Sequence, residues 1–274
     1  MLIDAHQHYW RIGQNGHEWP TADLARIYRD FGPQDWADAA GSVGVSGSVL
    51  VQSQPCDADT DWLLALADAA PSVKAVVGWA ELKAPDARDR IATLAAHPKL
   101  TGLRPMLQNL PEDDWIADPA LDPAIAAMVS HGLRFDALVF TRHLPHLRVF
   151  AKRWPELPIV IDHGAKPPIA EEQLDPWREE MARLAELPNV TCKLSGLFTE
   201  MAPAQSRGEL KPYVEHLADT FGPDRLMWGS DWPVILLAGD YSEWFELTGE
   251  LTGFDEAGRA ALFGGTAANF YGIR

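Results

Sequence analysis

The chain has 274 residues, with 23 lysines and arginines against 39 aspartates and glutamates, which gives a net charge of −16 at pH 7. This length suits one large α/β domain, and the acidic balance, without any block of basic residues, excludes nucleic acid and anionic membrane surfaces as expected partners. No leader-like segment precedes the first predicted strand and no apolar run reaches the length of a membrane span, so we expect a cytoplasmic protein.

Short apolar runs alternate with longer helical patterns along the chain, which is typical of a parallel sheet with crossover helices. The apolar runs predict eight strands, at Leu2–His6, Gly47–Gln52, Val73–Ala80, Leu100–Met106, Arg134–Val139, Ile159–His163, Val190–Ser195 and Leu226–Asp231. The helical patterns predict helices at Asp35–Val43, Asp59–Ala70, Asp86–His97, Ala120–His131, Thr141–Trp154, Trp177–Leu187, Glu209–Phe221, Tyr241–Thr248 and Asp255–Phe263, followed by a short terminal helix.

Eight strands that are each followed by a helix close into a (β/α)8 TIM barrel. The competing architecture is an open, doubly wound sheet, but the phosphate-binding GxGxxG motif of that fold is absent after the first strand. We therefore predict one barrel domain over residues 1–274.

The first predicted strand leads into His6-Gln-His8. Successive side chains of a strand alternate between its faces, so His6 and His8 leave the strand on the same side. This is a spacing typical of metal ligands, although a pair of hydrogen-bonded or surface histidines is the plainer interpretation. The rest of the chain has to decide between them.

Barrel enzymes carry their active sites at the C-terminal ends of the strands. The polar residues that the predicted strands bring to this end are His6, His8, Gln52, Gln54, Glu81, Arg104, Asp162, His163, Lys193, Ser195 and Asp231. They are dispersed along the sequence, and the barrel is expected to gather them at one mouth.

His163 and Asp231 each end an almost wholly apolar strand. An unpaired buried carboxylate is costly, so Asp231 needs a cation, a metal or a catalytic proton, although a turn-capping role is the alternative. His163 alone would be a satisfied core residue. Together with His6 and His8, the two complete a His3Asp donor set suited to Zn²⁺ or Mn²⁺.

Arg104 and Lys193 lie in apolar strands that would not bury a charge without a partner. Each is a candidate to bind a substrate oxygen or a developing oxyanion, and Gln52 is a candidate to bind a substrate hydroxyl. The alternative is a structural ion pair, for Arg104 with a neighbour such as Glu81.

Aromatic residues and one further histidine are candidates to line the substrate pocket. They are Trp10, Tyr28, His143 and Trp232, and ordinary packing is the alternative for each. The loop from Tyr9 to Gln34 is long and contains Gly13, Gly16 and Pro20, so it is a candidate lid over the mouth.

With these residues placed, the chain resembles the amidohydrolase superfamily, and within it the branch that contains the sugar-acid lactonases. The motifs that carry the resemblance are Ile3-Asp-Ala-His-Gln-His8, Gly102-Leu-Arg104, Ile161-Asp-His-Gly164, Cys192-Lys-Leu-Ser-Gly196 and Gly229-Ser-Asp-Trp-Pro233. Many members of the superfamily have a bridging lysine or glutamate on strand four and a histidine on strand five, whereas this chain has Arg104 and the run Arg134-Phe-Asp-Ala-Leu138.

The resemblance implies one divalent ion, zinc or else manganese, held by His6, His8, His163 and Asp231, or activity without any metal. It also implies a carboxylic-ester hydrolase that opens a neutral sugar lactone. In that reaction Asp231 activates a water, His163 serves the site as a further catalytic group, and the metal, Arg104 or Lys193 polarises the carbonyl. The alternatives are a metal-dependent decarboxylase of the same superfamily and a catalytically silent ligand-binding barrel. A homo-oligomer is left open.

Overall fold

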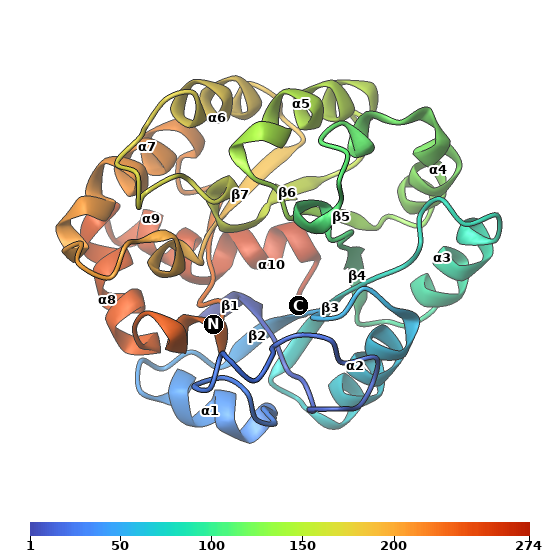
Figure 1. Ribbon diagram of the computed structural model, residues 1–274, viewed down its shortest axis with the longest axis horizontal. Helices are drawn as coiled ribbons and strands as arrows, with labels where there is room; N and C mark the ends of the chain where they lie inside the picture. Colours follow the sequence, from blue (N-terminus) through green and yellow to red (C-terminus); the bar gives the residue numbers. More distant parts are fainter.

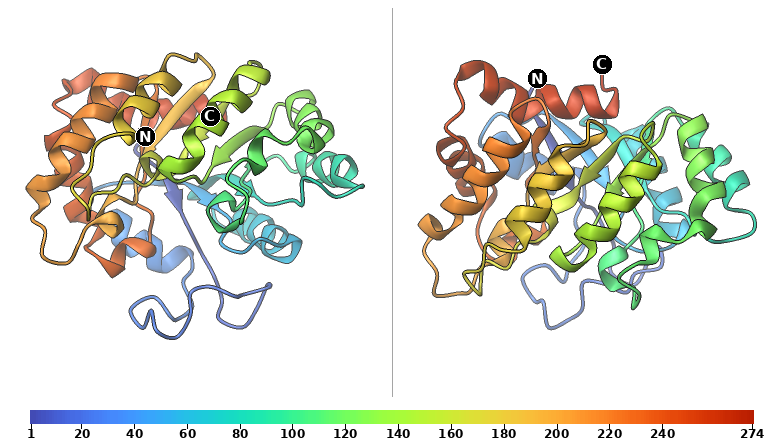
Figure 2. Two further views of the ribbon diagram at one scale, coloured as in Figure 1. Left: turned by 45° about the horizontal axis from the view of Figure 1, so that its top comes forward. Right: turned by 90° about the horizontal axis from the view of Figure 1, so that it is seen from above.

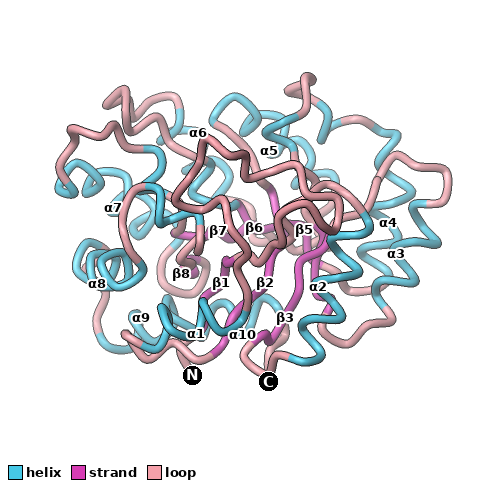
Figure 3. The backbone as a smooth tube through the Cα atoms, turned by 60° about the horizontal axis from the view of Figure 1, so that its bottom comes forward, coloured by secondary structure: helices cyan, strands magenta, loops and turns pink.

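The computed structural model describes residues 1–274. One parallel sheet contains all eight strands in sequential order. The strands are β1 (Ile3–Gln7), β2 (Gly47–Val51), β3 (Val73–Gly78), β4 (Leu100–Leu103), β5 (Arg134–Ala137), β6 (Ile159–Ile161), β7 (Val190–Leu194) and β8 (Leu226–Trp228). Figure 1 shows them at the centre of a ring of helices, and Figure 3 shows the same enclosure from another side. The predicted TIM barrel is confirmed.

A helix follows each strand, as predicted. The helices are α1 (Pro33–Gly41), α2 (Asp57–Ala69), α3 (Ala87–Ala95), α4 (Asp122–Ser130), α5 (Leu144–Arg153), α6 (Trp177–Ala185), α7 (Lys211–Phe221), α8 (Tyr241–Leu251), α9 (Glu256–Ala260) and α10 (Thr266–Tyr271). The longest of them, α2, has 13 residues. None of the helices combines the length and the hydropathy that a membrane crossing requires.

The barrel closes between its first and last strands just beyond the end of β8. The amide of Asp231 donates to the carbonyl of His6 at 2.8 Å, and the amide of His8 donates to the carbonyl of Trp232 at 2.7 Å. Beneath them the buried carboxylate of Asp4 accepts hydrogen bonds from the amide and the hydroxyl of Ser230, at 2.9 and 2.6 Å. These hydrogen bonds between the first and last strands therefore fix the segments that carry His6, His8 and Asp231, the ligands predicted there.

Several strands are shorter than the sequence predicts, because the chain leaves extended geometry as soon as it reaches the polar residues. β6 ends at Ile161, and His163 has a left-handed backbone with φ of 55°. β8 ends at Trp228, and Asp231 is also left-handed with φ of 58°. These residues sit on turns at the rim of the barrel.

The two ends of the barrel are covered differently. α10 and both chain termini lie at one end, where the strands begin, and the long loop between β1 and α1 projects from the opposite end, as Figure 2 shows. Side chains of α10 join an apolar layer inside the barrel, made by Ile3, Ala5, Val49, Val51, Ala75, Val77, Val160, Met227, Ala267 and Tyr271. The polar residues of the predicted site lie at the opposite end of the barrel, from which the loop projects.

Candidate active site

His6 and His8 lie side by side at the end of β1, with their Nε2 atoms 3.1 Å apart. The Nδ1 atom of His8 lies 2.8 Å from the carbonyl oxygen of Val51, which can only accept, so Nδ1 of His8 donates this hydrogen bond. His6 is fully buried, and burial together with the nearby Lys193 holds the pKa of its imidazole well below the usual value. The Nε2 atoms of both rings therefore face the same point.

His163 reaches this point from a turn of unusual backbone. Four successive residues, from His163 to Lys166, have left-handed φ values between 49° and 62°. Outside glycine this conformation costs roughly 1–2 kcal/mol per residue, so the surrounding contacts must hold it. One such contact is the indole of Trp177, which donates to the carbonyl of Gly164 at 2.6 Å.

The ring of His163 is held on its far side by β7 and the loop after it. Its Nδ1 lies 2.9 Å from the hydroxyl oxygen of Ser195. A side chain on Gly196 would come within 2.6 Å of the same nitrogen, so the ring requires glycine there. Burial lowers the pKa of His163 to about 4, which keeps the imidazole neutral at pH 7.

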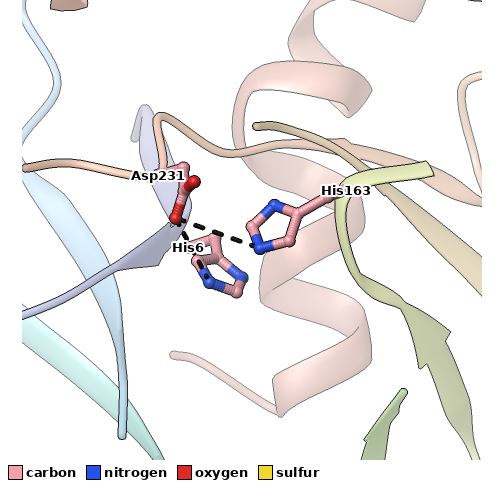
Figure 4. Close-up of side chains that lie close together, drawn as sticks. All are labelled: His6, His163 and Asp231. Carbon is pink, nitrogen blue, oxygen red and sulfur yellow. Dashed lines mark ion pairs between the residues drawn. The ribbon is translucent and has the colours of Figure 1, made fainter. Parts of the chain in front are cut away.

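Asp231 faces all three histidines, and Figure 4 shows it directed at His6 and His163. Its Oδ1 lies 3.4 Å from Nε2 of His8, 3.7 Å from Nε2 of His6 and 3.9 Å from Nε2 of His163. Burial alone would raise the pKa of this carboxyl, but the neighbouring imidazoles outweigh it and hold the pKa below the usual range. Asp231 is therefore ionised at neutral pH.

This donor set fits one divalent ion. The donor atoms of His6, His163 and Asp231 all lie within 4.8 Å of one another, and His8 adjoins two of them. Ligand atoms about 2.0–2.1 Å from a tetrahedral zinc stand about 3.4 Å apart, which lies between the shortest and the longest of the separations here. Neutral imidazoles and an ionised carboxylate are the protonation states that a metal needs.

A buried cluster of charges lies directly beneath His6. The ammonium of Lys193 is 2.6 Å from Oδ2 of Asp136, 3.0 Å from Oδ1 of Asp162 and 3.2 Å from Nδ1 of His6. Burial would raise the pKa of Asp162, but Lys193, His6 and Arg104 together hold it well below the usual value. Lys193 is fully buried and does not line the pocket, contrary to the expected substrate contact.

Arg104 lies at the edge of both the charged cluster and the pocket. Its Nη2 donates to the carbonyl of Gln52 at 2.5 Å, and its Nη1 lies 3.4 Å from Oδ2 of Asp162 and from Nε2 of His6. The ion-pair partner is thus Asp162 and not Glu81, which is exposed. The Nε of Arg104 is buried without a hydrogen-bond partner.

A pocket of about 870 Å³, counted to its open mouth, lies above these groups. Its lining residues are His8, Glu18, Trp19, Ser53, Gln54, Pro55, Arg104, Met106, Gln108, Asn109, Leu138, His163, Lys166, Asp231 and Val234. The sequence reasoning did not assign a role in the pocket to Glu18, Trp19 or Lys166. Lys166 stands three residues after His163, and that proximity was the available signal.

Besides Lys193, five of the predicted substrate contacts lie outside this lining. The indole of Trp10 donates to the carbonyl of Arg29 at 2.8 Å, and Trp232 is buried in the aromatic core. His143 accepts the amide of Phe140 at 2.9 Å through Nδ1, as a local cap. Tyr28 is 40% exposed on the outer loop, so it is directed to solvent.

The fifth of these residues, Gln52, is buried beneath the pocket. The side-chain amide of Gln52 donates to the backbone carbonyl of Arg104 at 2.9 Å. The backbone carbonyl of Gln52 accepts from the guanidinium of the same arginine. The structure therefore gives Gln52 a part in holding Arg104, instead of the expected contact with a hydroxyl.

A closed parallel barrel with three histidines and an aspartate at the C-terminal ends of its strands is the arrangement of a barrel enzyme, and this donor set is suited to a metal ion. The chain belongs to the amidohydrolase family, whose family model matches residues 3–273. The expected family is confirmed.

Two curated relatives cover almost the whole chain. An L-fucono-1,5-lactonase from Burkholderia ambifaria is 51% identical over 278 residues, which cover 99% of this chain and 95% of the relative. An L-fucono-1,5-lactonase from Burkholderia multivorans is 36% identical over 288 residues, which cover 100% of this chain and 96% of the relative. A crystal structure of an amidohydrolase from B. multivorans with bound zinc is 35% identical, covers all of both chains and superposes with a TM-score of 0.94.

Proposed function

We propose that this chain hydrolyses a sugar-acid lactone, and that L-fucono-1,5-lactone or a closely related aldonolactone is its substrate. The two full-length relatives with this activity in their names bear out the expected class of enzyme, a lactone hydrolase. The structural observation that carries the proposal is the ionised Asp231 beside three buried histidines at the floor of an open polar pocket.

We assign one divalent ion to His6, His8, His163 and Asp231, with zinc before manganese. The donor geometry supports this assignment, and so does the zinc in the amidohydrolase from B. multivorans. When bound, the ion supplies Lewis acidity that polarises the lactone carbonyl and favours deprotonation of water.

Asp231 carries the proton transfers in this proposal. Its carboxylate accepts a proton from the water that attacks the lactone carbonyl, and it returns the proton to the ring oxygen as that oxygen leaves. The products are one carboxylic acid and one hydroxyl on the same sugar chain. At pH 7 the Asp231 carboxyl is ionised, because its pKa lies below the usual range, and the His163 imidazole is neutral.

Arg104 is the cation of strand four that reaches the pocket. Its guanidinium lies 3.4 Å from Nε2 of His6, close to the place where the carbonyl oxygen gains negative charge. Lys193 acts from below, through Asp162, whose Oδ1 lies 3.0 Å from the ammonium and 3.4 Å from Nδ1 of His6, and we assign it a positioning role. The two cations of the predicted site thus have different roles.

The balance of charge in the pocket supports a neutral, polyhydroxylated substrate. Arg104 and Lys166 are matched by Glu18 and Asp231 in the lining, beside amide side chains that can bind hydroxyls. The ammonium of Lys166 is also paired with Glu200 at 3.2 Å. A dicarboxylated lactone would require further unpaired cations.

A pH-indicator screen of aldonolactones tests the proposal, because ring opening releases a proton. We expect acid release above the spontaneous rate, greatest with L-fucono-1,5-lactone, and a loss of at least about a thousandfold in kcat for Asp231→Asn. Circular dichroism of the variant checks that it is folded, and metal analysis of the same preparation counts the ion. An Asp231→Asn enzyme with full activity would contradict the assigned base.

The same screen, extended to carboxylated aromatics with carbon dioxide as a second readout, separates the two alternatives left open by the sequence. Carbon dioxide released from carboxylated aromatics, with no acid release from lactones, would favour the decarboxylase. A silent barrel would give neither product. The cytoplasmic location and the homo-oligomer stay predictions.

A further inference from the structure

The amide of Gln54 binds the long loop between β1 and α1 to the rest of the barrel. Its Oε1 accepts from the amides of Glu18 and Trp19, at 2.9 and 3.3 Å. Its Nε2 donates to the carbonyl of Trp19 at 2.6 Å and to the hydroxyl of Ser53 at 3.0 Å. A side-chain amide has two acceptor and two donor positions, so the capacity of Gln54 is fully used.

Gln54 is itself fixed from the side of α2. Oδ2 of Asp59, in the first turn of that helix, accepts from the amide of Ser53 at 2.9 Å and from the amide of Gln54 at 3.1 Å. Both Gln54 and Asp59 are 1% exposed. A rigid helix thus holds the short segment that in turn holds the loop.

The loop residues that Gln54 binds are those that line the pocket. Glu18 and Trp19 both belong to the lining, and the ring of Trp19 packs edge-on against Trp10 with centroids 5.4 Å apart. Much of the neighbouring chain on either side is exposed, and Figure 2 shows the loop extending away from the barrel. A second, weaker contact joins the thiol of Cys56 to the carbonyl of Asn15 at 3.5 Å.

We propose that Gln54 is a positioning residue, and that the Glu18–Trp19 segment it holds is the sugar-recognition wall of the pocket. The indole of Trp19 covers the apolar face of the sugar ring, and the carboxylate of Glu18 accepts hydrogen bonds from ring hydroxyls. This inference rests on the proposed lactonase function. It makes the loop a fixed wall that determines which lactone is bound.

The test compares Gln54→Met, Trp19→Leu and the double variant with the wild type. Methionine matches the length of glutamine without its hydrogen bonds. We expect KM for the best aldonolactone to rise about tenfold in each single variant, with kcat within about threefold of the wild type, because the wall binds the substrate without touching the reacting atoms. The double variant should raise KM by less than the two single effects combined, since Gln54 acts partly through Trp19.

Limited trypsin digestion gives a readout that does not depend on activity. The loop contains Arg11, Arg26 and Arg29, and we expect faster cleavage there in Gln54→Met than in the wild type. Gln14→Met, an exposed glutamine of the same loop, is the matched control and should leave both KM and cleavage unchanged. Gln54→Glu, which keeps the acceptors but loses both donors, should behave like Gln54→Met.

Unchanged KM in Trp19→Leu would overturn the recognition wall, and unchanged cleavage in Gln54→Met would overturn the positioning role. Additive effects in the double variant would show that Gln54 does not act through Trp19. A wild type without lactonase activity would overturn the proposed function and the sugar-recognition role with it, while the digestion would still decide whether Gln54 fixes the loop.

Discussion

Tyr271 donates its hydroxyl to Oδ2 of Asp136 at 2.7 Å, and this bond joins the last helix of the chain to the charged cluster beneath the active site. The same oxygen accepts from the ammonium of Lys193 at 2.6 Å, and Lys193 in turn contacts His6. All four side chains are buried. The helix that covers one end of the barrel is therefore connected by polar contacts to the chemistry at the other end.

Replacing Tyr271 by phenylalanine should lower stability more than activity. The change removes one hydrogen bond to a buried carboxylate that Lys193 still compensates, and a hydrogen bond to a charged group contributes about 1.5–3 kcal/mol. We expect the free energy of unfolding in urea to fall by about this amount, with kcat changed only slightly. Tyr28→Phe, on the exposed loop, is the control and should match the wild type; an equally stable Tyr271→Phe would contradict the role of this bond.

Replacing Lys193 by methionine tests whether this lysine touches substrate or supports the fold. Its loss leaves Asp136 and Asp162 buried without their main cation, and breaking a buried pair in this way costs about 3–5 kcal/mol. We expect a large drop in the urea midpoint, partly restored by adding Asp136→Asn. If the variant instead kept its stability and lost only affinity for the lactone, Lys193 would be a substrate contact after all.

The barrel could be predicted because its signal is local. Eight apolar runs alternate with helical patterns, and the first strand presents His6 and His8 at a spacing that depends only on strand geometry. Once the strands are counted, the C-terminal ends of a barrel must converge, so His163 and Asp231 could be assigned to the same site.

The remaining parts of the site depend on distances that no local pattern contains. The apolar pattern marks Lys193 as buried, but it does not say how far down the barrel axis its ammonium lies. Glu18 and Trp19 lie at the pocket in a long loop that is hydrogen-bonded to Gln54, and Lys166 reaches it through a left-handed turn in which three of four residues are not glycine, so the sequence does not mark the turn. Such contacts are set by tertiary packing.

Asp59 should give the protein a measurable dependence of stability on pH. Burial raises the pKa of its carboxyl from 3.8 to about 6, so between these values the folded chain keeps a proton that the unfolded chain has lost. The contribution of Asp59 to the free energy of unfolding should therefore fall as pH rises from about 4 to about 6, with a slope that approaches about 1.4 kcal/mol per pH unit. Urea unfolding measures this contribution as the difference in free energy of unfolding between the wild type and Asp59→Asn, which should decrease across this range, whereas Asp219→Asn, an exposed carboxyl, should follow the wild type.

Ser195 should determine how tightly the site holds its ion without touching it. The hydroxyl of Ser195 lies 2.9 Å from Nδ1 of His163 and fixes the ring so that Nε2 faces Asp231. Removing a partner of this kind costs about 10–100-fold in metal affinity, and we expect the zinc dissociation constant of Ser195→Ala to rise by that factor in competition with a chromophoric chelator. Ser46→Ala, an exposed serine, controls for general effects of the substitution. An unchanged dissociation constant in Ser195→Ala would mean that His163 is oriented by its left-handed turn alone, or that it does not bind the ion.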